Sequence, residues 1–234
     1  KKKYKCYLVE DACHAFGSTY KSKGKNYKIG SCKHSDIATF SLHPLKTITT
    51  GEGGIVTTND EKLDNKMKKI RSLGIKKNKK KHWDYDVVEN GFNFRLTDFQ
   101  CALGISQLSK VDYFIKKRKK IADKYISALK KINSIIIPEY KNKYLSSHHL
   151  FLINFKKNKL KIKEKFIRFM LKNKILIQYH YIPIYKFKNF KGKYLKKNSE
   201  IYYKNCVSLP IYVNLTKKEQ EYIISTIIEF FNKV

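Results

Sequence analysis

Residues 36–58, "DIATFSLHPLKTITTGEGGIVTT", carry the pattern on which the fold prediction rests. Two apolar runs, residues 36–42 and 54–58, flank a segment rich in threonine and glycine, which predicts two strands joined by a loop. The loop carries Lys46 five positions after Ser41. Because 51 of the 234 residues are lysine or arginine, the question is whether Lys46 is one more solvated cation or a chemical reagent.

The segments on either side extend this pattern. Residues 6–10 ("CYLVE") form a continuous apolar run that ends at Asp11, which predicts a buried strand with neighbours on both faces. Residues 59–60 ("ND") cap an amphipathic helix. Strands alternating with helices or loops predict an α/β fold with a largely parallel sheet, whose ligands lie at the carboxyl ends of the strands. Asp11, Ser41 and Lys46 all lie at or just beyond such an end. No earlier element supplies neighbours for residues 6–10, so we expect the C-terminal part of a longer protein.

The middle of the chain predicts one long helix. Thr97 and Gln100 form a capping box, and the helical pattern then runs to about residue 132. Gly104 is a poor helix residue, which predicts close packing or a bend there.

After Pro138 the pattern changes to shorter elements. We expect strands at residues 149–155 and 175–183, a helix at 161–174 and a last helix behind the capping box of Thr216 and Glu219. This change predicts two domains: residues 1–125, the remainder of a large α/β domain, and residues 126–234, a small α+β domain.

The composition is that of a globular protein with an unusual charge. Hydrophobic residues make up 42% of the chain, and the formal net charge is +32. Such a charge favours polyanionic partners. The lysines are spread along the whole chain, however, and the densest run, "KKNKKKH" at residues 76–82, is interpreted as a solvated loop. The alternative from a different class is a basic nucleic-acid-binding protein in which Lys46 has no catalytic role. The sequence contains no nucleic-acid-recognition motif that would support it.

The cysteines and the hydropathy exclude other classes. Five cysteines without a C-x-x-C pair predict free thiols in a reducing cytoplasm. Cys32 and His34 have no second ligand pair at metal spacing, so no metal is expected. No apolar run approaches the roughly 20 residues of a membrane span, so no membrane association is expected.

Asp11 and Lys46 together suggest a chemistry. A lysine amine can form a Schiff base with the aldehyde of pyridoxal 5'-phosphate (PLP). PLP also needs a carboxylate against its ring nitrogen, and hydroxyls or backbone amides for its phosphate. Asp11, Ser41, Lys46 and the "GEGG" loop supply those parts. Each also has an ordinary explanation: a helix cap, a buried hydroxyl, a surface cation and a turn.

The order and wording of the motifs resemble a known family. "VEDACHAFGSTYKSK", then "GSCKHSDIATFSLHPLKTITTGEGGIVTTND", then "NGFNFRLTDFQCALGISQL" resemble the DegT/DnrJ/EryC1/StrS family of PLP-dependent nucleotide-sugar aminotransferases. The resemblance continues through "QYHYIPIY" and "VSLPIYVNLTKKEQ". It implies aminotransferase fold type I. The sequences of these motifs are most similar to the branch of the family that acts on the route to pseudaminic acid.

The resemblance implies roles for individual residues. Lys46 is the expected covalent attachment point of PLP, and Asp11 the partner of its ring nitrogen. His14 is expected against the cofactor's 3-oxygen and Ser41 at its phosphate. Asn93, in "GFNFR", is expected at the phosphate of a neighbouring subunit's cofactor, which implies a homodimer with shared active sites. His180 and Tyr181, in "YHYIP", resemble a substrate-binding stretch near the sugar-nucleotide.

The implied reaction moves an amino group from glutamate to C4 of a UDP-linked 4-keto-6-deoxy amino sugar. Two further alternatives stay open: a PLP-dependent sugar dehydratase of the same fold, and an inactive fragment. Some relatives that remove a hydroxyl replace the lysine with histidine, so Lys46 favours transamination. The family's first part, which completes the cofactor cradle, is not represented in this sequence.

Overall fold

The computed structural model describes residues 3–78, 80–81, 83–138, 144–156, 160–190 and 197–233. The chain divides into two compact units: the first comprises Lys1–Tyr113 with Asn142–Ser147, the second Phe114–Lys141 with His148–Val234. The sequence predicts a domain boundary at residue 125, which lies in the helix Val111–Leu129. The division lies earlier in the same helix, because its later turns bury Ile121, Ala122 and Tyr125 in the hydrophobic core of the second unit.

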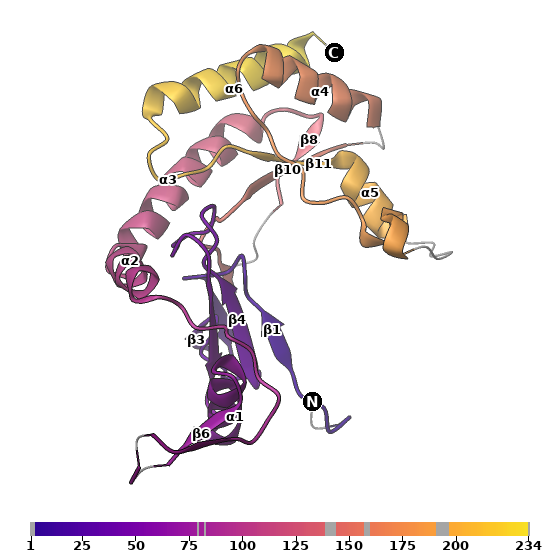
Figure 1. Cartoon of the computed structure of the whole chain (residues 1–234). Helices are drawn as coiled ribbons and strands as arrows, with labels where there is room; N and C mark the ends of the chain where they lie inside the picture. Colours follow the sequence, from indigo (N-terminus) through magenta and orange to yellow (C-terminus); the bar gives the residue numbers. More distant parts are fainter. Residues whose placement is uncertain are drawn as a thin grey trace. The chain divides into compact units, whose positions relative to one another are not determined.

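The strands of the first unit form three small sheets (Figure 1). The first, in the order β1-β4-β5, contains β1 (Val9–Asp11), β4 (Ile37–Ser41) and β5 (Gly54–Thr58). The second, in the order β3-β2-β9, contains β3 (Lys25–Lys28), β2 (Thr19–Ser22) and β9 (Tyr144–Leu145), and the third pairs β6 (Ile75–Lys77) with β7 (Tyr85–Val87).

The first sheet positions the candidate site. Strand β1 runs parallel to β4, so Asp11 lies opposite Thr39, whereas β4 and β5 are antiparallel. The expected α/β class is confirmed, but the sheet is not largely parallel, because the loop between β4 and β5 contains no crossover helix and returns the chain alongside itself. Strand β1 is also less buried than expected: among the described strands it pairs only with β4, and Val9 is 57% exposed.

Two helices complete the first unit. Helix α1 (Glu61–Arg71) begins at Asp60, whose carboxylate accepts hydrogen bonds from the first-turn amides, as the sequence predicts. Helix α2 (Asp98–Leu108) begins at the predicted capping box of Thr97 and Gln100. The predicted long helix is broken at Ser109, whose hydroxyl donates to the carbonyl of Ser106 at 2.9 Å. Such side-chain bonds compete with helical backbone bonds.

The second unit packs helices on an antiparallel sheet. The sheet has the order β11-β10-β8, formed by β11 (Cys206–Leu209), β10 (Phe151–Phe155) and β8 (Ile135–Ile136). The helices are α3 (Val111–Leu129), which begins in the first unit, α4 (Leu160–Lys172), α5 (Lys197–Asn205) and α6 (Lys217–Asn232), with short 3-10 turns η1 (Ile184–Lys186) and η2 (Lys188–Phe190). The predicted capping box of α6 is confirmed.

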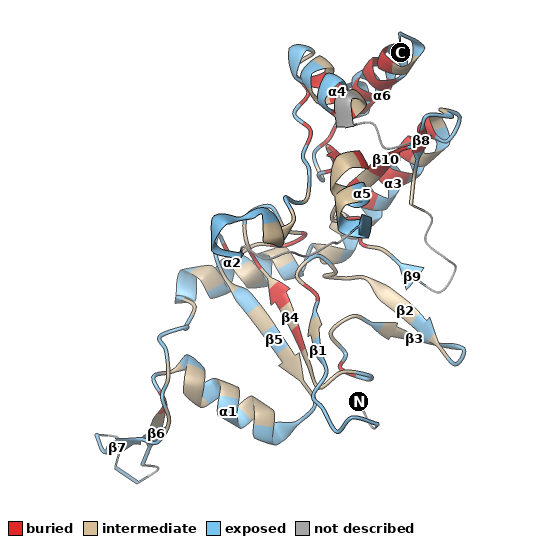
Figure 2. Ribbon diagram, turned by 90° about the vertical axis from the view of Figure 1, so that its right-hand side faces the viewer, coloured by how far each residue is buried: buried red, intermediate tan, exposed pale blue. Residues whose placement is uncertain are grey.

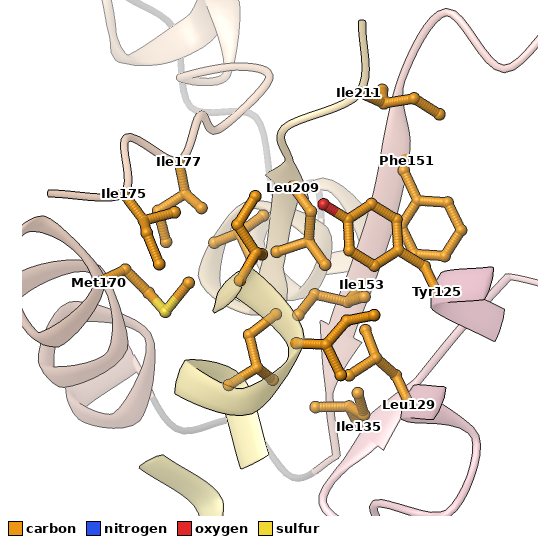
Figure 3. Packing of buried hydrophobic residues seen from close by; sticks show 14 of the residues in the cluster. Tyr125, Leu129, Ile135, Phe151, Ile153, Met170, Ile175, Ile177, Leu209 and Ile211 are labelled. Atoms are coloured by element: carbon orange, nitrogen blue, oxygen red, sulfur yellow. The ribbon is translucent and has the colours of Figure 1, made fainter. Parts of the chain in front are cut away.

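The larger hydrophobic core lies in this unit, where buried residues concentrate on the sheet and its helices (Figure 2). The ring centroids of Tyr125 and Phe151 lie 5.0 Å apart, and the two side chains pack against each other (Figure 3). The predicted strand at residues 175–183 is reduced to one bridge between Gln178 and Ser208, beside the segment in which Ile175 and Ile177 are buried. The residues are apolar enough for a strand, but the chain leaves the sheet after that bridge.

Two further expectations concern the surface. Of the basic run at residues 76–82, Lys76 and Lys77 are exposed in β6, whereas Lys79 and His82 lie outside the described residues. Among the helices of the described ranges, none combines the length and apolar character that crossing a membrane requires.

Candidate active site

Asp11 ends β1 in a local turn that orients its carboxylate. The backbone amide of Cys13 donates to Asp11 Oδ1 at 3.1 Å, a side-chain turn typical of aspartate at the end of an element. The hydrogen bonds from the Cys13 thiol and amide lower the pKa of Asp11, and the positive fields of His14 and Lys46 lower it further. Asp11 is therefore ionised at neutral pH.

The loop that carries Lys46 is held at both ends by its own backbone. Leu42 accepts a hydrogen bond from the Thr50 amide at 3.0 Å, and the Leu42 amide donates to Gly53 at 2.9 Å. In a third hydrogen bond of the loop, the Thr49 hydroxyl donates to the Leu42 carbonyl at 2.8 Å. Thr50 is buried and Lys46 half-buried, so the sequence after the lysine anchors the loop.

Ser41 is the last residue of β4 and faces the start of this loop. Its Oγ accepts a hydrogen bond from the His43 amide at 3.3 Å, which leaves the hydroxyl proton available for an anionic ligand. The His43 carbonyl in turn accepts from the Lys46 amide at 2.9 Å. Ser41 and Lys46 are thus joined through one tight turn.

The structure brings three of the predicted residues into one electrostatic group. Both His14 and Lys46 act on the Asp11 carboxylate by Coulomb interaction, and Lys46 also acts on the Cys13 thiol. The cause is topological, because Asp11 ends β1, which pairs with β4, and Lys46 follows β4. Asp11 and the loop that carries Lys46 therefore follow the same edge of the sheet, and His14 lies three residues after Asp11.

Asn93 lies on a different segment of the first unit. It forms a bridge with Ser72, just after α1, and the flanking amides of Phe92 and Phe94 donate to α1 carbonyls at 2.7 and 2.9 Å. The rings of Phe92 and Phe94 stack at 4.8 Å, and both are more than half exposed. Asn93 is itself exposed and lies between these two phenylalanines in the sequence.

His180 and Tyr181 belong to the second unit. His180 Nδ1 lies 3.0 Å from Ser208 Oγ, and its ring meets that of Tyr181 edge-on at 4.6 Å. Tyr181 is 62% exposed and lines a pocket of about 590 Å³. The other lining residues are Pro183, Ile184, Tyr185, Asn198, Ser199 and Tyr202.

Sequence reasoning missed Cys13 as part of the site. Its amide and thiol both act on Asp11, and Asp11 in turn raises the pKa of the Cys13 thiol, first through the hydrogen bond, with burial as the next cause. The signal was available, since an aspartate commonly accepts from the amide two residues later. The direction of the thiol, in contrast, depends on the fold.

The match to known proteins covers most of the chain. The model of the DegT/DnrJ/EryC1/StrS aminotransferase family matches residues 1–228. The chain belongs to this family. Among curated relatives, it is 39% identical to a UDP-4-amino-4,6-dideoxy-N-acetyl-beta-L-altrosamine transaminase of Campylobacter jejuni, over 100% of the chain and 61% of that relative. The chain therefore spans about three fifths of that relative's length.

Solved structures of the family share this fold. Helicobacter pylori PseC, an aminotransferase involved in the biosynthesis of pseudoaminic acid, matches with a TM-score of 0.90 and 33% identity, over 100% of the chain and 62% of PseC. The PLP form of the putative sugar aminotransferase Spr1654 from Streptococcus pneumoniae matches with a TM-score of 0.86 and 27% identity, over 97% of the chain and 58% of that protein. The expected family and aminotransferase fold are confirmed.

The side chains at this sheet edge fit PLP by their chemistry. An ionised Asp11 suits a protonated ring nitrogen, the half-buried Lys46 supplies an amine, and the Ser41 hydroxyl supplies a donor for a phosphate. Lys46 also lowers the pKa of Asp11 by Coulomb interaction, so the two side chains interact. Among the described residues, no cluster of three His, Cys, Asp or Glu side chains is arranged to hold a metal.

Proposed function

We propose that this chain acts as a PLP-dependent aminotransferase that moves an amino group from glutamate to C4 of a UDP-linked 4-keto-6-deoxy amino sugar, on the route to pseudaminic acid or a related glycan. The observation that carries the proposal is the electrostatic group of Asp11, His14 and Lys46 at the end of β1 and β4, in a member of an aminotransferase family. The name of the Campylobacter relative supports the substrate class.

When bound, PLP supplies an electron sink that stabilises negative charge at the carbon that exchanges its proton. Asp11 stays ionised and holds a proton on the ring nitrogen, since its pKa lies below the ordinary value. Lys46 supplies the amine that binds the cofactor, and Nζ, once freed, moves the proton as general base and acid. Ser41 donates to the phosphate, and His14 orients the ring through its 3-oxygen.

The remaining candidates contact the substrate or a second subunit. Tyr181 lines a pocket whose aromatic walls suit a planar or sugar ring, and His180 is fixed by Ser208 beside it. Asn93 binds the phosphate of a second subunit's cofactor, which makes the protein a homodimer. The five unpaired cysteines suit a cytoplasmic location, where nucleotide-sugars are available.

The decisive experiment replaces the candidate lysine. Lys46→Ala is expected to abolish the visible absorbance that arises when a lysine bonds to PLP, because Lys46 is the amine whose charge acts on Asp11. Lys62→Ala, at an exposed position of α1, is the matched control and should keep the absorbance. An unchanged spectrum in Lys46→Ala would falsify the assignment of Lys46.

A second measurement separates transamination from dehydration. Glutamate added to the PLP-loaded protein is expected to release one equivalent of 2-oxoglutarate and to leave the cofactor in its amino form. A wild-type protein that binds PLP but releases no 2-oxoglutarate with glutamate contradicts a glutamate-dependent aminotransferase.

A further inference from the structure

Helix α2 lies against the loop that carries Lys46. Gln100 Nε2 donates to the carbonyl of Glu52 at 3.0 Å, and a Cβ added to Gly104 would lie only 2.9 Å from Thr50 Cγ2. Residues 100 and 104 are four positions apart and so share one face of the helix. The close packing predicted at Gly104 is therefore a contact between this face and the loop.

The same face extends to the residue before the helix cap. Leu96 Cδ2 would lie 2.9 Å from a Cβ added to Gly53, and Gly53 has a φ of 156°, which other residues rarely adopt. Three residues near the far end of the loop, Thr50, Glu52 and Gly53, thus lie against α2 or the residue before its cap, and Glu52 makes the hydrogen bond. The near end of the loop carries Lys46, and the bond between Leu42 and Gly53 joins the two ends.

The side chain of Gln100 makes two kinds of hydrogen bond. Its Oε1 accepts from the amide of Thr97 at 2.9 Å, which caps the helix, while its Nε2 donates to the loop. Capping alone does not need the amide group: in α6, Glu219 Oε2 accepts from the Thr216 amide at 2.8 Å in the same motif. A carboxylate at position 100 can make the cap but cannot donate to Glu52.

We propose that Gln100 is a positioning residue: by tying the Glu52 carbonyl to α2, it fixes the loop and holds Lys46 next to Asp11. The catalytic consequence rests on the role proposed for Lys46, whereas the contact itself does not. Freed from Gln100, the loop keeps its internal backbone bonds but loses a polar attachment to α2. Lys46 then samples positions that its turn alone allows.

The test uses Gln100→Glu in the full chain, since this change keeps the cap acceptor, removes the donor and sets a negative charge against the Glu52 carbonyl. Glu219→Gln, in the matching motif of α6, is the control. We expect amide hydrogen exchange in residues 42–54 to become about threefold to tenfold faster in Gln100→Glu, the effect of losing one hydrogen bond. Glu219→Gln should leave that segment unchanged.

A second readout follows Lys46 itself. The rate at which a small acetylating reagent modifies Lys46, relative to Lys62 in the same sample, should change at least about twofold in Gln100→Glu, because loop opening alters the amine's access and its distance from Asp11. Unchanged amide hydrogen exchange in residues 42–54 contradicts the proposal that Gln100 fixes the loop. Faster exchange with an unaltered Lys46 rate overturns the positioning role. Neither readout requires PLP, so a failure of the proposed function remains distinguishable from a failure of this proposal.

Discussion

Asp11 and Cys13 form a pair whose ionisation can be measured directly. The Asp11 hydrogen bond is the first cause that raises the pKa of the Cys13 thiol, and burial and the Asp11 charge follow. A raised thiol pKa means less thiolate at a given pH, and the thiolate is the reactive form. Asp11→Asn is therefore expected to shift the pH profile of Cys13 alkylation to lower pH, as seen by mass spectrometry of the modified peptide.

The exposed Cys101 in the same chain is the internal control, and its profile should be the same in both proteins. If the Cys13 profile stays where it is after Asp11→Asn, the thiol does not bond to this carboxylate. A shift to higher pH would mean that the Asp11 carboxylate lowers the pKa of the Cys13 thiol, which contradicts the assigned direction.

The residue-scale features that the sequence predicts are those set by strand ends. Asp11 and Lys46 could be paired in advance because each follows an apolar run, and the parallel pairing of β1 with β4 brings those ends together. The second hydrogen bond of Gln100 could not be predicted. Its acceptor, Glu52, is 48 positions away, and only tertiary packing brings it within reach.

At the scale of elements, a buried arginine joins helix α3 to the segments that flank strands β10 and β11. Arg118 is 5% exposed, and its Nη1 donates to Ile211 at 2.9 Å and to His148 and His149 at 3.3 Å. Burial lowers its pKa, and Nε has no hydrogen-bond partner among the described residues. Carbonyl dipoles from two segments thus compensate one buried cation.

Arg118→Lys is expected to destabilise the protein by about 1–3 kcal/mol, because an ammonium lacks the planar fork of the guanidinium and loses charge-assisted bonds while the charge stays buried. Urea unfolding followed by circular dichroism measures the difference. Arg168→Lys, at an exposed position of α4, should change the midpoint little. Equal midpoints for the two variants would mean that the carbonyl contacts contribute nothing net.

Element starts could be predicted more closely than element ends. Asp60, Thr97 and Thr216 begin α1, α2 and α6 as expected, because a cap satisfies backbone amides within its own first turn. The break at Ser109 and the early end of the strand predicted at residues 175–183 depend on competing hydrogen bonds and on the neighbouring strand. Local sequence does not specify either.

At the scale of the whole molecule, helix α2 has one face on the Lys46 loop and leaves apolar side chains uncovered. Phe99 is 89% and Ile105 71% exposed. We use the name α2 surface for the exposed apolar side chains that this helix carries: Phe99, Leu103, Ile105 and Leu108. Large exposed apolar patches mark interaction sites more often than isolated apolar side chains do. The net charge of +32 opposes self-association at long range, so close contact requires apolar burial.

We predict that the proposed homodimer uses this surface as its interface. Ile105→Glu is then expected to weaken self-association at least about tenfold, because an unpaired carboxylate buried between apolar side chains is costly. Sedimentation velocity across a concentration series measures the dissociation constant. Leu171→Glu, at a 58% exposed position of α4, is the matched control and should leave the constant unchanged. A wild-type chain that stays monomeric over the series contradicts the α2 surface as the interface, and so do equal dissociation constants for the two variants. An effect of Ile105→Glu alone places the second subunit on α2, the helix that also contacts the Lys46 loop.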